Sequence, residues 1–139
     1  MFFLLITVLV IGALVFLVKI GKENERKETK NSSKVISIDL SPYTWKEEFE
    51  LAGVHIEPNP AYIIQFVKPK HPVKIYHEQD NKYSSRALAV FHEGYNIGYI
   101  KEDDIDEVNE LRKKPHLVLI EKSEYQSGGY LYVSVNIYF

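Results

Sequence analysis

Hydrophobic residues follow two different patterns along this chain. Residues 1–18 carry no charge, and Thr7 has the one polar side chain among them. From Lys34 onward, apolar and polar positions alternate in short runs, which is typical of strands that bury one face. The first pattern predicts a membrane-spanning helix, because a run of this length in helical conformation reaches across most of a bilayer core. The second pattern predicts a mainly β domain.

The pattern divides the chain into three parts. It predicts an anchor at residues 1–20, a polar linker at residues 21–33 and a domain at residues 34–139. No basic segment precedes the apolar run and no small-residue cleavage site follows it, which favours an anchor over a cleaved signal peptide. Positive charges gather just after the run, at Lys19, Lys22, Arg26, Lys27, Lys30 and Lys34. The positive-inside rule therefore predicts a single-pass cell-membrane protein, held in the lipid bilayer by residues 1–20, with its N-terminus outside and its domain in the cytoplasm.

Short alternating runs predict most of the domain's strands. Turn residues (Gly, Pro, Asn and Asp) separate these runs. The predicted strands are residues 35–40, 49–56 (weaker, with a bulge at Gly53), 62–67, 73–77, 86–92, 96–101, 117–122 and 130–139. Strands this short and this closely spaced favour a small β-barrel over a parallel α/β sheet.

One segment has a helical pattern instead. Ile105, Val108 and Leu111 recur every third residue within residues 102–114, and Pro115 ends the segment. The carboxylates stand at its start (Glu102, Asp103, Asp104 and Asp106) and the cations at its end (Arg112, Lys113 and Lys114). This order complements the helix dipole, and it explains the acidic cluster better than a metal site does.

Composition and charge narrow the possible functions. The 139 residues include no cysteine, which excludes disulfide scaffolds, cysteine-ligated metals and cysteine nucleophiles. Six of the 17 Lys and Arg and three of the 19 Asp and Glu precede residue 35, so the domain keeps 11 cations against 16 anions, a net charge of −5. Because non-specific affinity comes mainly from phosphate neutralisation, we expect weak binding to duplex DNA.

Catalysis finds little support in the sequence. The five histidines (His55, His71, His77, His92 and His116) show neither the spacing of a helical zinc site nor a recognisable catalytic triad. No phosphate-binding glycine loop is present. A metal-dependent hydrolase built on His77, Glu78 and Asp80, with His92 and Glu93 approaching across a hairpin, is a disfavoured alternative. We therefore predict a protein that is not an enzyme and has neither cofactor nor metal.

Residues 73–90 resemble the central signature of the HIRAN domain family. The sequence VKIYHEQDNKYSSRALAV matches an apolar strand, a Glu-x-x-Asn-x-Tyr loop and a second apolar strand. Gly94, the strand Ile97-Gly98-Tyr99-Ile100-Lys101 and the predicted helix then follow in the family's order, and Ala52-Gly53-Val54 resembles the start of its first strand. The resemblance spans residues 49–122 and implies an OB-like barrel with one helix at its side.

The resemblance also implies a ligand, because HIRAN domains in remodelling ATPases capture the 3′ end of single-stranded DNA. Asn81, Tyr83, Tyr99 and Lys101 stand at matching positions, while Lys82, Ser84, Arg86 and His55 replace the usual residues. The implied nucleic-acid-binding residues are His55, Asn81, Lys82, Tyr83, Ser84, Arg86, Tyr99 and Lys101.

The sequence thus predicts a membrane-anchored module that binds single-stranded nucleic acid or DNA 3′ ends without catalysis. In this interpretation the Tyr83 ring stacks on a base, which contributes about 1–3 kcal/mol. The alternative is a membrane-tethered module of the same fold that binds another protein, in the same groove or at an open sheet edge.

Overall fold

The computed structural model describes residues 37–56 and 58–139. The predicted anchor and linker lie outside these residues, and so do the first two positions of the predicted strand at residues 35–40. Within the described residues, no helix has both the length and the apolar character needed to cross a bilayer. The anchor, its topology and the cellular location stay predictions.

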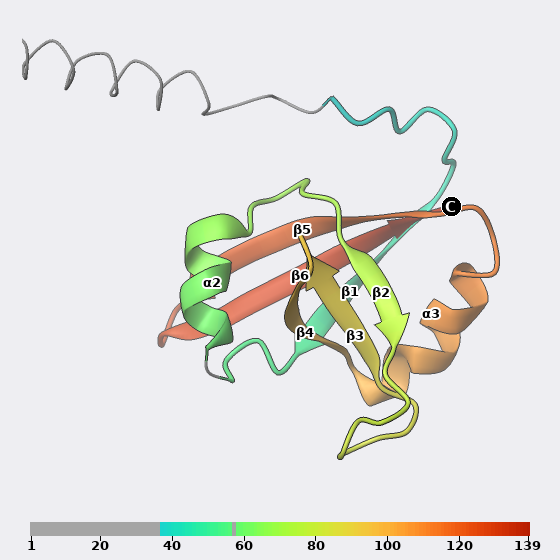
Figure 1. Cartoon of the computed structure of the whole chain (residues 1–139). Helices are drawn as coiled ribbons and strands as arrows, with labels where there is room; N and C mark the ends of the chain where they lie inside the picture. The colour runs from blue at the N-terminus through green and yellow to red at the C-terminus, as the bar shows by residue number, and fades with distance from the viewer. Residues whose placement is uncertain (1–36, 57) are drawn as a thin grey trace, which may run out of the picture. The chain divides into compact units, whose positions relative to one another are not determined.

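Six strands form one sheet in which all neighbours are antiparallel (Figure 1). They are β1 (Lys46–Ala52), β2 (Lys74–His77), β3 (Leu88–His92), β4 (Tyr95–Ile100), β5 (Leu117–Gln126) and β6 (Tyr130–Tyr138). Their order across the sheet is β2-β3-β4-β1-β6-β5, so β1 joins the β2–β4 meander to the β5–β6 hairpin. The prediction of a mainly β domain is confirmed, and each of these six strands overlaps a predicted one.

The sheet is not a closed barrel, and that prediction is wrong. Its edge strands, β2 and β5, are not neighbours in the sheet, and one isolated bridge joins Pro72 to Leu119. Three backbone bonds accompany this bridge, from Lys70 N–H to Ile120 O (2.7 Å), from Ile120 N–H to His71 O (2.9 Å) and from Val73 N–H to Val118 O (3.0 Å). We call this contact of residues 70–73 with residues 118–120 the seam. Pro72 has no N–H to extend the ladder, and no further pairing between β2 and β5 follows it.

Two further strand predictions are also wrong. Residues 62–67 fall on the helix α2 (Asn59–Phe66) and its C-cap Val67. Ile63 and Val67, four residues apart, are buried, whereas Ile64 and Phe66 are exposed, so the buried stripe is helical although β-formers fill the segment. Residues 37–40 form no strand, because Asp39 Oδ1 accepts a hydrogen bond from the Ser41 N–H (2.9 Å) and turns the backbone locally.

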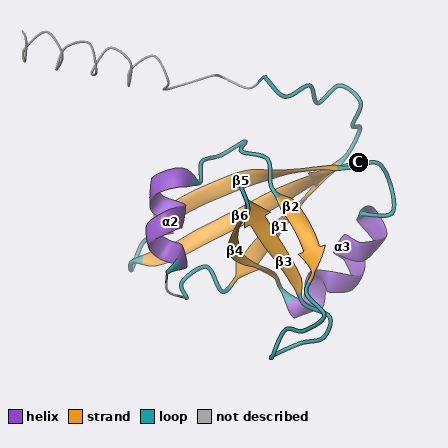
Figure 2. Cartoon of the chain, in the orientation of Figure 1, coloured by secondary structure: helices purple, strands orange, loops and turns teal. Residues whose placement is uncertain are grey.

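The helix predicted at residues 102–114 is confirmed, but the observed helix is shorter. A 3₁₀ turn, η1 (Glu102–Asp104), leads into α3 (Ile105–Leu111), whose Ile105, Val108 and Leu111 are buried. The cations predicted for its last turn lie beyond it, and Arg112 instead donates from Nη2 to the carbonyl of Ile75 (2.9 Å). Figure 2 shows α2 and α3 at opposite ends of the sheet.

Strand β6 shows how the core is built. Alternation predicts one apolar face for this segment, and its members Leu131, Val133, Val135 and Ile137 are buried, whereas Phe139, beyond the end of β6, is partly buried. Two polar residues of the opposite face are buried too, and each is paired. Ser134 donates to Glu48 (2.7 Å), and Asn136 donates to Glu121 (2.5 Å). Because strands lie on both sides of β6, cross-strand pairing accounts for the buried part of this polar face.

Candidate functional site

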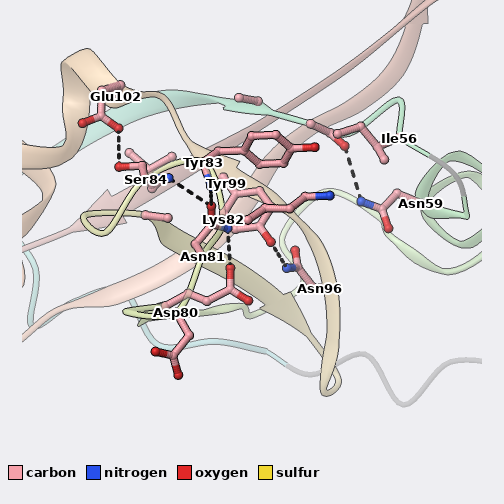
Figure 3. Close-up of a pocket in the computed structure, with 15 residues that line it drawn as sticks. Ile56, Asn59, Asp80, Asn81, Lys82, Tyr83, Ser84, Asn96, Tyr99 and Glu102 are labelled. Carbon is pink, nitrogen blue, oxygen red and sulfur yellow. Dashed lines mark hydrogen bonds between the residues drawn. The ribbon is translucent and has the colours of Figure 1, made fainter.

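A concavity of about 660 Å³ lies where the end of β1, the β2–β3 loop, β4 and the start of η1 meet (Figure 3). This volume falls within the range of small-molecule sites. The lining comprises Ala52, Gly53, Ile56, Asn59, Glu78, Asp80, Asn81, Lys82, Tyr83, Ser84, Ala87, Asn96, Tyr99, Ile100 and Glu102. We call it the loop pocket.

Asn81 builds the loop that forms one wall of the loop pocket. Its side-chain oxygen accepts hydrogen bonds from the N–H groups of Tyr83 (2.9 Å) and Ser84 (3.2 Å). Its side-chain nitrogen donates to Glu78 (2.7 Å), so both ends of the amide have protein partners. Asn81 therefore shapes the turn, which is the usual role of an asparagine that bonds the backbone two residues on.

In this turn the Tyr83 side chain points out to solvent. The side chain is 82% exposed, and the Lys82 ammonium stands 4.8 Å from the ring centroid. Ile56, from the segment after β1, is a second large apolar side chain of the lining and is 56% exposed. Single exposed apolar side chains are ordinary, but two from separate segments that line one concavity make it a candidate site for an apolar or aromatic group.

Tyr99 contributes to the inner wall rather than to the mouth. Its hydroxyl accepts a hydrogen bond from the Asn96 amide (3.0 Å), whose oxygen in turn accepts from the N–H of Gly98 (2.9 Å). Burial, aided by a hydrogen bond with the Glu78 carboxylate, raises the pKa of Tyr99 above its ordinary value. The phenol therefore stays neutral at physiological pH, and its hydroxyl already has protein partners.

Charge in the loop pocket is mainly negative. Three carboxylates, those of Glu78, Asp80 and Glu102, belong to the lining, and Lys82 is its one cation among the described residues. Within the part of the chain that the structure describes, no carboxylate lies within 4.0 Å of the Lys82 ammonium. The loop pocket can therefore accept hydrogen bonds readily but can neutralise few phosphates.

Two of the predicted nucleic-acid-binding residues form ion pairs with carboxylates of the domain. Arg86 pairs with Asp106 (2.5 Å) and Glu102 (3.8 Å), and Lys101 pairs with Glu50. The Lys101 pair raises the pKa of that ammonium, mainly through the hydrogen bond with Glu50. Both ion pairs are partly exposed, so salt screens them and each contributes little to stability.

The structure brings five of the eight predicted residues into the lining. These are Asn81, Lys82, Tyr83, Ser84 and Tyr99, whereas His55, Arg86 and Lys101 are not among the lining residues. Ser84 donates from its hydroxyl to Glu102 (3.1 Å) and so connects the loop to η1.

The other ten lining residues were not among the predicted ones. They include the three carboxylates and the side chains of Ile56, Asn59 and Asn96. Asn59 has a local signal, because it stands between two prolines and its amide donates to the Gly53 carbonyl (3.4 Å). Nothing local marks Ile56, since it reaches the loop pocket only when the end of β1 pairs with β4 at Ala52 and Tyr99.

No three His, Asp or Glu side chains come together as metal ligands within the described residues.

Comparisons with known proteins give one structural neighbour. No protein-family model matches the chain, and the search of curated proteins gave no match. Among solved structures, the chain is similar to the HIRAN domain of human HLTF, with a TM-score of 0.49 and 12% sequence identity, over 68% of this chain and 74% of that one. The neighbour bears the family name that the sequence resemblance suggested. A likeness at this identity concerns the course of the backbone and assigns no ligand.

Proposed function

We propose that the loop pocket binds one end of a single-stranded nucleic acid, with a base held against Tyr83. One observation carries the proposal: two exposed apolar side chains, Tyr83 at 82% and Ile56 at 56%, line the same concavity of about 660 Å³. Every nucleobase has a π face, and stacking on an exposed tyrosine contributes about 1–3 kcal/mol. Ile56 offers an aliphatic contact to the same ligand.

The charge of the loop pocket favours a strand end over a long strand or a duplex. The lining holds three carboxylates and one ammonium, and the domain as a whole is acidic. Few phosphates can be neutralised, so affinity must come from one base and its sugar. Carboxylates accept hydrogen bonds from sugar hydroxyls but repel a terminal phosphate. These properties support the finer proposal that the bound end is a free 3′ hydroxyl.

Titration with short labelled oligonucleotides at low salt tests this proposal. We expect a strand with a 3′ hydroxyl to bind several-fold more tightly than the same strand with a 3′ phosphate. We also expect blunt duplex of the same sequence to bind more weakly than either strand. If the 3′ hydroxyl and the 3′ phosphate strands bind equally, the proposed preference for a free 3′ hydroxyl is wrong, whereas binding of a single-strand end still stands. No binding of any strand at low salt would overturn both, and would favour the alternative of a protein-binding module.

We also propose that residues 1–20 hold this domain at a bilayer. The support is the uncharged run of residues 1–18 and the positive charges that follow it. After expression in bacteria, the chain should stay in the membrane fraction when peripheral proteins are stripped at alkaline pH. A variant with Leu9→Arg and Leu14→Arg is the control, and it should leave that fraction because central arginines oppose insertion. Release of the unaltered chain would contradict the anchor.

A further inference from the structure

A pair of histidines that the proposed function does not use joins three parts of the fold. His71 Nδ1 lies 2.9 Å from His92 Nε2, with the two rings almost parallel at 5°. His92 closes β3 and is 2% exposed, whereas His71 belongs to the seam. On the other side of His92, Nδ1 lies 3.0 Å from the hydroxyl of Tyr62 on α2.

The hydrogen bonds of this pair leave room for a single proton between the rings. The Tyr62 hydroxyl lies 3.2 Å from the His92 carbonyl and 3.0 Å from His92 Nδ1. In the tautomer in which this hydroxyl donates its one proton to the carbonyl, its oxygen accepts from His92 Nδ1–H. Neutral His92 then has a lone pair at Nε2, which accepts from the Nδ1–H of His71. A first added proton can sit on the outer nitrogen of His71 without disturbing this bond. A second proton, on His92 Nε2, would set two N–H groups against each other at 2.9 Å.

His71 occupies a position on which the seam depends. Its carbonyl accepts the Ile120 N–H (2.9 Å), and its neighbour Lys70 donates to the Ile120 carbonyl (2.7 Å). Lys70 holds a left-handed backbone conformation (φ 68°), which a lysine keeps only where its surroundings impose it. A break between the two rings therefore removes the side-chain contact that ties this strained segment to β3.

Charged and titratable neighbours on every side affect the pair. Glu93, which follows His92 in the β3–β4 turn, favours the charged form of His92, while burial has the larger effect and lowers the pKa of that ring. Tyr62 and Tyr95 stack at 4.0 Å, and burial raises the pKa of Tyr62, so this phenol stays neutral. Lys68 and Lys70 precede His71 in the sequence, and the Lys68 ammonium donates to the Ile64 carbonyl (3.0 Å). On β5 the Glu121 carboxylate accepts from Asn136.

We propose that the His71–His92 pair is a proton-sensitive latch that keeps the seam between residues 70–73 and β5 closed. The latch is closed while the pair holds at most one extra proton, and it opens when both rings are charged. The free rings of the open state take up protons below the ordinary histidine pKa of about 6.5, so acid shifts the population toward the open state. Acid favours the open state because the open state binds more protons than the closed state. Opening would also change a groove of about 700 Å³ that Pro72, Val73 and Val118 help to line.

Amide hydrogen exchange on the whole chain tests the latch. Between pH 7.5 and pH 5.0, after correction for the intrinsic rates, the protection of the Lys70, Val73 and Ile120 amides should fall on the order of 20-fold, as uptake of one net proton requires. Amides of the β1–β6 ladder should keep their protection. His71→Gln should clearly reduce the pH dependence, because the glutamine amide can donate to or accept from His92 and leaves His92 as the one titrating ring of the pair. His116→Gln is the matched control, since that ring bonds the Lys114 carbonyl (2.8 Å) apart from the pair, and it should leave the effect unchanged.

Two results would overturn the latch. One is a seam whose protection in the unaltered chain follows the β1–β6 ladder over the whole pH range. The other is an undiminished pH dependence in His71→Gln. Should that variant fail to fold, the ¹⁵N shifts of the ring nitrogens in the unaltered chain decide. A proton-sensitive pair must show His92 Nε2 unprotonated at neutral pH and protonated as the seam amides lose protection, and ring shifts that do not move with the seam contradict it.

Discussion

Replacing Gly98 by alanine is expected to lower the free energy of unfolding by about 3 kcal/mol. A Cβ at this position would lie 2.7 Å from the carbonyl oxygen of Ala52 and 3.1 Å from a methyl group of Val54. The first contact is with backbone, so β1 and β4 must separate where they pair at Ala52 and Tyr99. The backbone of Gly98 also has φ +152°, which other residues rarely adopt. Chemical denaturation of the two proteins measures the difference.

Gly94→Ala is the control that separates the two causes of destabilisation in Gly98→Ala, namely the clash of the added Cβ and the unfavourable backbone conformation. Gly94 has φ +85° in the β3–β4 turn, and a Cβ there would meet nothing within 4 Å. We expect this control to cost about 1 kcal/mol, from the backbone conformation alone. If Gly98→Ala were no more destabilising than Gly94→Ala, the approach of β4 to the end of β1 would be looser than the structure has it. Because Gly98 is bonded to Asn96 beside Tyr99, the inner wall of the loop pocket would be in doubt as well.

The largest effect on binding is expected from Tyr83→Ala. Loss of one base–aromatic stack, at about 1–3 kcal/mol, weakens the binding of a single strand roughly 5- to 160-fold. Fluorescence anisotropy with a strand that has a 3′ hydroxyl measures it. The side chain is 82% exposed, so its removal should change the free energy of unfolding by less than about 0.5 kcal/mol. A loss of affinity would therefore report on the ligand contact rather than on folding.

Tyr125→Ala is the matched control for this variant. Tyr125 lies on β5, is 55% exposed and is not part of the loop-pocket lining, so its removal should leave affinity unchanged. Tyr83→Phe keeps the ring and should keep most of the affinity. Unchanged affinity in Tyr83→Ala would contradict the proposed stacking of a base on Tyr83. Equal losses of affinity in Tyr83→Ala and Tyr125→Ala would indicate a non-specific effect of surface tyrosines.

Local sequence signals predicted the elements that local physics controls. Alternation located β6, and the three-residue spacing of Ile105, Val108 and Leu111 located α3. The same reasoning mistook residues 62–67 for a strand, because β-branched and aromatic residues are frequent there and only Ile63 and Val67 are buried. Propensity is a weak prior that packing overrides. The prediction that cations occupy the last turn of α3 was wrong for a similar reason. The helix ends at Leu111, and Arg112 donates to the Ile75 carbonyl on β2.

The predicted residues of the candidate site lie in the β2–β3 loop, apart from Tyr99 on β4. Asn81 and Tyr83 lie in the loop pocket, and the turn that Asn81 closes is the ordinary chemistry of an asparagine. Arg86 and Lys101 were expected to bind nucleic acid because of the family resemblance. Their carboxylate partners, Asp106 and Glu50, are 20 and 51 residues away, and no local pattern could reveal them.

The sequence by itself determined the alternation of strands, the buried stripe of α3 and the loop that exposes Tyr83. Each of these depends on residues a few positions apart, whose periodicity or turn chemistry acts before the chain is packed. Only the tertiary structure decided that the sheet stays open, that Ile56 faces the same concavity as Tyr83 and that His71 meets His92. These features join segments 20 or more residues apart, and strand pairing brings them together.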